Sequence, residues 1–160
     1  MAQVLLSLGS NVNRRANIDG GLASLRRLFG SIICSRIYES EAVGFDGDAF
    51  YNLVVAVETD FSVAELLMLL HQIEYDFGRV RGGKKFSSRT LDIDILSYDE
   101  QVGLVDGIEL PRGEILQHAF VLLPMAELVP EQKHPVLKQS YADLWQAFDK
   151  KAEQKLWPID

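Results

Sequence analysis

The chain has 160 residues, of which 48% are hydrophobic and 24% are charged, and its formal net charge is −7. This length and composition are ordinary for a globular domain with a substantial core, and we expect residues 1–160 to form one domain. The acidic balance argues against a general nucleic-acid-binding protein, because such proteins usually carry a basic face.

The first half of the chain contains strand and helix patterns. Strand-forming residues occupy 4–8, 31–38 and 50–58. Residues 14–29 repeat apolar side chains at helical spacing, and residues 62–77 open with a capping-box pattern, so both are predicted to be amphipathic helices.

The second half adds another strand, a hairpin and two short helices. Residues 89–96 contain a strand-forming run, and residues 97–109 suit a hairpin. Helices are predicted at 120–128, with Pro124 near the start, and at 141–151. The order β-α-β-β-α-β predicts an α+β, ferredoxin-like fold: an antiparallel sheet with helices on one face, plus the hairpin and C-terminal helices.

Two carboxylates, Asp92 and Asp94, stand two residues apart in the strand-forming run. Side chains i and i+2 of a strand share a face, so both should project together while Leu91, Ile93 and Ile95 are buried on the other face. Carboxylates about 6–7 Å apart repel each other unless a cation lies between them. Mg²⁺ suits this position, because it takes one or two carboxylates from a protein and further oxygens from substrate phosphates.

A basic segment, residues 79–89, precedes these carboxylates and contains five Lys or Arg residues and a Gly pair. Taken alone, an Asp-x-Asp pair is more often a solvated strand end, and a basic glycine loop is more often an exposed turn. Together, in an acidic chain, they separate charge as metal-bound polyphosphate requires. The two segments therefore favour a phosphate site.

With these residues in place, the chain resembles the 6-hydroxymethyl-7,8-dihydropterin pyrophosphokinase family of the folate pathway, which transfers a pyrophosphoryl group from ATP to a pterin alcohol. The resemblance covers nearly the whole chain. Its specific part is the signature Ser88-Arg89-Thr90-Leu91-Asp92-Ile93-Asp94-Ile95-Leu96. The weaker matches are residues 8–11, 50–52, 78–81 with Glu74, and 119–124.

The resemblance implies that Asp92 and Asp94 hold two Mg²⁺ ions, which bridge the α- and β-phosphates of ATP. Arg79 and Arg89 would join these aspartates as catalytic residues. The implied nucleotide contacts are Glu74, Arg81, Phe86, Arg89, Ile95, Arg112 and His118, with the turn after Asp94 helping to seat the nucleotide.

For the pterin, the resemblance implies stacking between Phe50 and Phe120. The ring's polar edge would be recognised by Asn52 and by the loop residues Ser40, Ala42 and Val43. Taken singly, each phenylalanine is more often a core residue. Asn52 is harder to explain that way, because Asn is depleted in strands and a buried amide needs partners.

The chain departs from the family pattern between Pro111 and Phe120. The family usually has His directly after the Pro and Arg two residues before the Phe, whereas this chain has Arg112 and His118. Arg112 keeps a positive charge, but His118 would be mostly neutral at pH 7 unless phosphate favours its protonated form. Two alternatives stay open: a weakened paralogue that binds pterin or ATP or acts on a related pterin, and a ferredoxin-like interaction domain without a small-molecule site.

The remaining expectations concern partners and location. The resemblance implies ATP and hydroxymethyl-dihydropterin as small-molecule partners. We also expect a monomeric protein, with no nucleic-acid or membrane partner. The sequence has no basic N-terminal region and no apolar run near the ~18 residues of a membrane span, which predicts a cytoplasmic protein.

Overall fold

The computed structural model of the chain describes residues 1–41, 49–78, 90–148 and 156–159. In chain order the elements are β1 (Ala2–Ser10), α1 (Arg14–Phe29), β2 (Ile33–Cys34), β3 (Tyr38–Ser40), β4 (Phe50–Thr59), α2 (Val63–Asp76), β5 (Asp92–Tyr98), β6 (Gly103–Val105), β7 (Ile108–Leu110), α3 (Glu114–Gln117), α4 (Ala119–Leu128), α5 (Tyr141–Ala147) and β8 (Leu156–Pro158).

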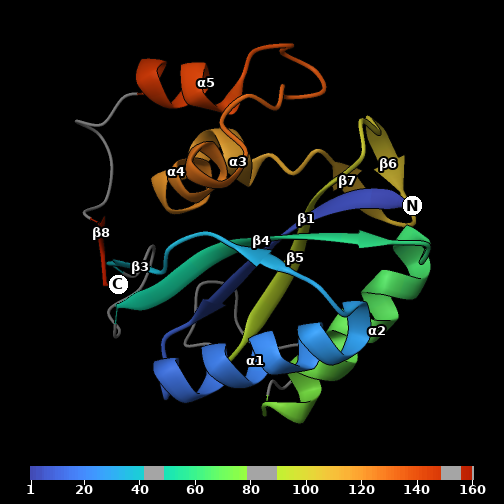
Figure 1. Cartoon of the computed structure of the whole chain (residues 1–160), viewed down its shortest axis with the longest axis vertical. Helices are drawn as coiled ribbons and strands as arrows, with labels where there is room; N and C mark the ends of the chain where they lie inside the picture. The colour runs from blue at the N-terminus through green and yellow to red at the C-terminus, as the bar shows by residue number, and fades with distance from the viewer. Residues whose placement is uncertain (42–48, 79–89, 149–155, 160) are drawn as a thin grey trace.

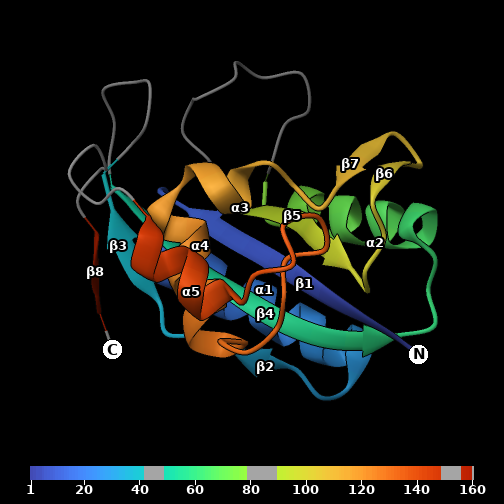
Figure 2. The ribbon, with the colours of Figure 1, turned by 90° about the horizontal axis from the view of Figure 1, so that it is seen from above.

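The main sheet has the order β5-β1-β4-β3-β8, and β2 also pairs with β4. The pairings within this sheet are antiparallel, and β6 and β7 form a separate hairpin. The predicted α+β antiparallel fold is thus confirmed. The hairpin lies beside α2 (Figure 2), where the Asp106 carboxylate accepts a hydrogen bond from the backbone N–H of Ala64 at 3.1 Å.

Helices cover both faces of the sheet (Figure 1). On one face, apolar residues of α1 and α2, including Ile18, Leu25, Leu66 and Leu70, pack with alternate residues of the strands. Ser62 and Glu65 form the predicted capping box of α2. On the other face, α3, α4 and α5 cover a second apolar cluster that includes Leu5 of the sheet. The C-terminal helices therefore add a layer opposite the pair of helices that the β-α-β-β-α-β order predicts.

The strand predicted at residues 31–38 is split into β2 and β3. Cys34 pairs with Val55, and Tyr38 pairs with Asn52. Between these two pairs, the β2–β3 segment advances by four residues while β4 advances by three. The extra residue breaks the ladder. Between the two strands, the Ser35 hydroxyl accepts a hydrogen bond from Val54 N at 2.9 Å.

The C-terminal third also differs from the sequence prediction. Helix α4 begins at Ala119, so Pro124 lies in its interior and not near its start. Helix α5 ends at Ala147, and residues 149–151 lie outside the described part of the chain. Helix α3 and strand β8 are each too short to give a readable period, and neither was predicted.

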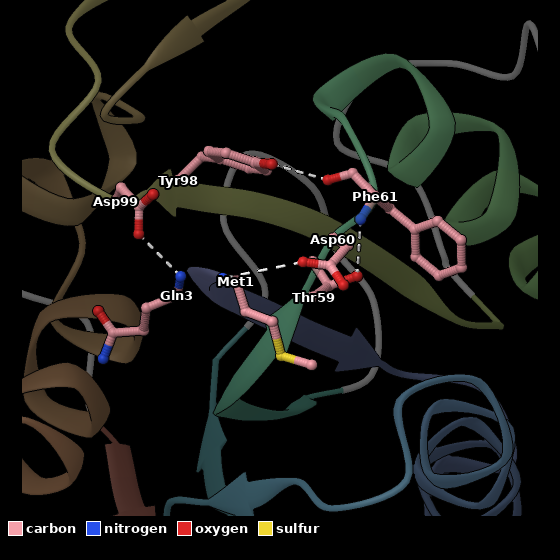
Figure 3. A network of polar contacts seen from close by, with 7 residues as sticks. All are labelled: Met1, Gln3, Thr59, Asp60, Phe61, Tyr98 and Asp99. Carbon is pink, nitrogen blue, oxygen red and sulfur yellow. Dashed lines mark hydrogen bonds and ion pairs between the residues drawn. The ribbon is translucent and has the colours of Figure 1, made fainter.

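Polar contacts join the ends of β1, β4 and β5 at the edge of the sheet where the chain starts (Figure 3). The N-terminal ammonium lies 3.8 Å from Asp60, and the Asp99 carboxylate accepts a hydrogen bond from Gln3 N at 2.8 Å. Tyr98 donates its hydroxyl hydrogen to Phe61 O at 2.7 Å. Among the described residues, no helix is long and apolar enough to cross a membrane.

Candidate active site

The two carboxylates lie together on β5, as their spacing predicts. Asp92 pairs with Gly9 and Asp94 with Ser7 of β1, and both side chains are partly exposed. Leu91, Ile93 and Ile95 are buried in the core with α1 and α2. Asp92 and Asp94 therefore project from the opposite face of the sheet.

Along the strands, the side chains of that face change from large and apolar to small and polar. Leu5 and Val54 pack beneath α4, whereas further along the same strands come the smaller Ser7 and Gly9 and the polar Asn52. A Cβ atom on Gly9 would lie 3.0 Å from Asn52 Oδ1 and 3.8 Å from the Phe50 ring. The missing side chain lets the Asn52 amide and the Phe50 ring lie close to the β1 backbone at Gly9. Since β5 and β4 flank β1, the strands that carry the carboxylates and Asn52 lie about 10 Å apart, two strand spacings.

Asn52 and Ser40 form a buried polar pair on β4 and β3. The Asn52 amide donates to Ser40 Oγ at 2.8 Å, and the two residues are 8% and 1% exposed. This bond fixes the orientation of the Asn52 side chain. Phe50, two residues earlier, is paired with Ser40. The predicted pterin residues Ser40, Phe50 and Asn52 thus lie together.

Glu74 of α2 holds the strand that carries the carboxylates. Its side chain is buried, and Oε2 accepts a hydrogen bond from Ile93 N at 2.8 Å. Because β5 is the outermost strand of the sheet order, the N–H groups on its free side need partners other than a neighbouring strand. Glu74 supplies one of them between Asp92 and Asp94.

Ser10 fixes the residues just before β5. Its hydroxyl oxygen lies 2.5 Å from Thr90 O and 3.0 Å from Val12 O, and the residue is fully buried. The segment that enters β5 is therefore tied to the end of β1.

Arg14, at the start of α1, joins the ends of β3 and β4. Its guanidinium forms an ion pair with Glu39 and donates to Ala49 O at 3.1 Å. The Arg14 Cζ atom also lies 4.0 Å from the centre of the Tyr51 ring. These contacts hold the two strands that carry Ser40 and Asn52.

Arg112 follows the β6-β7 hairpin and reaches the carboxylate pair. Its Nη2 atom lies 3.9 Å from Asp94 Oδ1, and its Nε donates to Glu114 Oε2 at 2.9 Å. Burial by itself would lower the pKa of Arg112, but the carboxylates of Asp94, Glu114 and Asp92 outweigh burial, and the pKa is raised.

His118 and Phe120 stack at the start of α4. Their ring centres are 4.8 Å apart with an angle of 18° between the planes. His118 is the N-cap residue of α4, and its carbonyl oxygen accepts hydrogen bonds from Val121 and Leu122 at 3.1 and 3.0 Å. Phe120 itself is partly exposed.

Some predicted site residues cannot be placed beside these. Ala42, Val43, Arg79, Arg81, Phe86 and Arg89 lie outside the described residues. The turn expected after Asp94 is absent, because β5 continues to Tyr98. Ile95 is 1% exposed and its side chain packs in the core, so a nucleotide contact there would have to come from its backbone.

The donor set of the carboxylate pair fits Mg²⁺. The described residues contain no group of three or more His, Cys, Asp or Glu side chains that could hold a metal. Asp92 and Asp94 supply the one or two carboxylates that protein-bound Mg²⁺ typically uses, and both side chains are partly exposed, so waters and phosphates can reach them.

The sequence patterns predict no role for Gly9, Ser10, Arg14 or Glu39, although Gly9 and Ser10 belong to a segment that resembles the family. A glycine at the end of a strand was the one signal available, because such a glycine often marks a close approach of another group. The contacts of Arg14 could not be foreseen, since they join elements far apart in the sequence.

The chain is similar in sequence to proteins of known family. Residues 5–130 match the family model described as 7,8-dihydro-6-hydroxymethylpterin-pyrophosphokinase (HPPK). A 2-amino-4-hydroxy-6-hydroxymethyldihydropteridine pyrophosphokinase of Pseudomonas aeruginosa is 35% identical over 137 residues, covering 83% of this chain and 84% of that protein. The protein of the same name from Aquifex aeolicus is 32% identical over 141 residues, covering 87% and 88%.

Other similar proteins are much longer. The chain is 34% identical to the folic acid synthesis protein FOL1 of Dictyostelium discoideum over 136 residues, which cover 84% of this chain and 20% of that protein. A crystal structure of Plasmodium falciparum HPPK-DHPS with pteroate superimposes with a TM-score of 0.71 at 17% identity, covering 91% of this chain and 42% of the other. At this identity the likeness shows the fold.

Proposed function

The chain belongs to the 7,8-dihydro-6-hydroxymethylpterin-pyrophosphokinase family, ATP-dependent enzymes of folate biosynthesis, and on that premise we propose that it transfers a pyrophosphoryl group from ATP to 6-hydroxymethyl-7,8-dihydropterin. The products would be AMP and the pterin pyrophosphate. The observation that carries the proposal is that the carboxylate pair of β5 and the Asn52–Ser40 pair lie on either side of Gly9 of β1.

On the nucleotide side, Asp92 and Asp94 would hold two Mg²⁺ ions against the phosphates of ATP. When bound, Mg²⁺ would neutralise phosphate charge and lower the pKa of the pterin hydroxyl. Arg112 and His118 lie on the segment that leads from the hairpin to α4, and we propose that both contact the phosphates. Arg79, Arg81, Phe86 and Arg89 stay predicted nucleotide contacts.

On the pterin side, the buried Asn52–Ser40 pair would recognise the polar edge of the ring. A planar heteroaromatic ring needs only a few fixed hydrogen-bonding groups for specificity, and it gains stacking energy from aromatic neighbours. Phe50 on β4 and Phe120 on α4 would supply the two stacking surfaces. Ala42 and Val43 stay predicted contacts.

In the reaction, the pterin hydroxyl oxygen would bond to the β-phosphorus of ATP while the bond from that phosphorus to the α-phosphate oxygen breaks. The hydroxyl proton is released and AMP leaves. Phosphoryl transfer asks little covalent chemistry of a protein, so positioning by Asn52, Ser40 and the aspartates would dominate. We further propose that residues 1–160 act as one catalytic domain, a cytoplasmic monomer.

The test is to follow AMP and pterin pyrophosphate by phosphorus NMR in a mixture of the chain, Mg²⁺, ATP and the pterin. Asp92→Asn and Asp94→Asn should each lower the rate by at least about 100-fold, because even outer-shell partners of metal ligands cost 10- to 100-fold. Circular dichroism should show that both variants remain folded.

The matched control is Glu100→Gln, which removes one exposed carboxylate from the turn after β5, at the far end of that strand. Its rate should equal that of the unchanged chain. Normal turnover by either aspartate variant would refute the metal assignment. Binding of both substrates without AMP formation would instead identify a binding paralogue.

A further inference from the structure

Arg112 is fixed beside the carboxylate pair by its backbone. Its N–H donates to Leu96 O at 2.9 Å, so the chain leaving the hairpin is bonded to β5 two residues beyond Asp94. From this anchor the side chain returns along the strand toward Asp94.

The guanidinium divides its contacts unequally between two carboxylates. Its Nε–Glu114 hydrogen bond is short, at 2.9 Å, whereas the Nη2–Asp94 distance is 3.9 Å, at the outer limit of an ion pair. The Arg112 side chain is 27% exposed and that of Asp94 39%, so water screens the charges only in part. Arg112 can therefore leave Asp94 and stay bonded to Glu114.

A cation at this position also offsets the repulsion between the Asp92 and Asp94 carboxylates. Asp92 and Asp94 project from one face of β5, and like charges so close disfavour the ionised forms unless a positive charge is near. Arginine remains charged at any physiological pH, so its contribution is permanent.

We propose that Arg112 is an internal counter-cation of the metal site: its guanidinium neutralises Asp94 while no metal is bound, and it must withdraw from Asp94 when a divalent cation binds. This inference rests on the proposed function, because it takes Asp92 and Asp94 as the metal ligands. Arg112 competes with the metal, so it sets how weakly the chain binds a divalent cation in the absence of nucleotide.

The test measures Mn²⁺ binding to the purified chain by electron paramagnetic resonance, without nucleotide or pterin, at pH 7 and low ionic strength, where ionic contacts are least screened. Arg112→Gln should bind Mn²⁺ about tenfold more tightly, the size expected for removing one charge from beside a divalent ion in a half-exposed site. Arg112→Met, of similar length, should behave alike. Thermal unfolding checks that both variants are folded.

Two further variants separate the possible failures. Arg26→Gln removes the same charge from an exposed position near the end of α1 and should bind Mn²⁺ as the unchanged chain does. Asp94→Asn should weaken binding strongly. If binding depends on Asp94 but neither Arg112 variant tightens it, the counter-cation inference alone is overturned. If neither the unchanged chain nor the Arg112 variants bind Mn²⁺, or if Asp94→Asn has no effect, the metal assignment is refuted and the inference with it.

Discussion

The Glu74 carboxylate accepts the backbone N–H of Ile93 at 2.8 Å, which ties α2 to the residue between the two aspartates. The bond crosses from a helix in one layer to the outer strand of the sheet. It holds the backbone at the one point that sets the directions of both Asp92 and Asp94.

Glu74→Ala should destabilise the chain and slow turnover. The substitution leaves a buried N–H without its partner, which costs about 1–3 kcal/mol in the free energy of unfolding. Urea unfolding measures this loss. Glu74→Gln keeps an acceptor oxygen at the same reach and should lose clearly less. An alanine variant as stable as the unchanged chain would show that the bond contributes nothing.

Gly9→Ala should impair the use of the pterin while the fold is retained. The new methyl group would lie 3.0 Å from Asn52 Oδ1, so the amide must shift. Displacements of about 1 Å in a reacting site can cost up to ~100-fold in rate, and we expect at least a tenfold loss of kcat/KM for the pterin. In the control, Gly113→Ala, the nearest atom would be Gln117 Nε2 at 3.5 Å, an ordinary contact. Equal kinetics of the two variants would contradict the role of Gly9.

Arg14→Gln should raise the KM for the pterin more than it changes kcat. The substitution removes the Glu39 ion pair and the contact with the Tyr51 ring, and so loosens the strands that carry Ser40 and Asn52. A cation–π contact alone contributes about 0.5–2 kcal/mol, which corresponds to a several-fold change in KM. Arg27→Gln is the control on the same helix, because Arg27 is exposed and its guanidinium donates to Ser24 Oγ at 3.0 Å. The prediction fails if both variants have the same KM.

Stability should fall on mild acidification because of His134. Burial lowers its pKa from 6.5, and its Nδ1 accepts hydrogen bonds from Val136 N and Leu137 N, both at 3.2 Å. The unfolded chain therefore binds the proton more readily than the folded chain. The contribution is complete above about pH 6.5 and is lost as pH falls toward the folded-state pKa, by up to about 1.4 kcal/mol per pH unit.

His134→Asn tests this pH dependence. The Asn side chain can offer an acceptor oxygen to the same two N–H groups, but it does not titrate. Urea unfolding at pH 7 and pH 5 should show a smaller loss of stability for this variant than for the unchanged chain. Equal losses would place the acid sensitivity elsewhere.

Local patterns carried most of the predictions that the structure confirms. The alternation around Asp92 and Asp94 placed both carboxylates on one face, because the strand period depends on backbone geometry alone. The capping box at Ser62 placed the start of α2 for a similar reason, since the two residues that form it, Ser62 and Glu65, are only three positions apart in the sequence.

Contacts between distant segments could not be predicted in the same way. The Arg112–Asp94 pair depends on how the hairpin brings the chain back to β5. No local sequence pattern predicts that path. Whether residues 31–38 form one strand or two depends on how they pair with β4, and their own sequence does not specify that pairing. Arg14 pairs with Glu39 only once three elements have been assembled.

Strand β8 lies beyond residues 5–130, the part that matches the family model, yet it pairs with β3, which carries Ser40. Ile159 N also donates to Ile37 O at 3.0 Å. Shortening the chain before Leu156 would expose the backbone groups along β3, and an open strand edge is a template for association with another molecule. Expression of a piece trimmed to the matching residues would therefore risk aggregation that begins at β3, for reasons unrelated to catalysis.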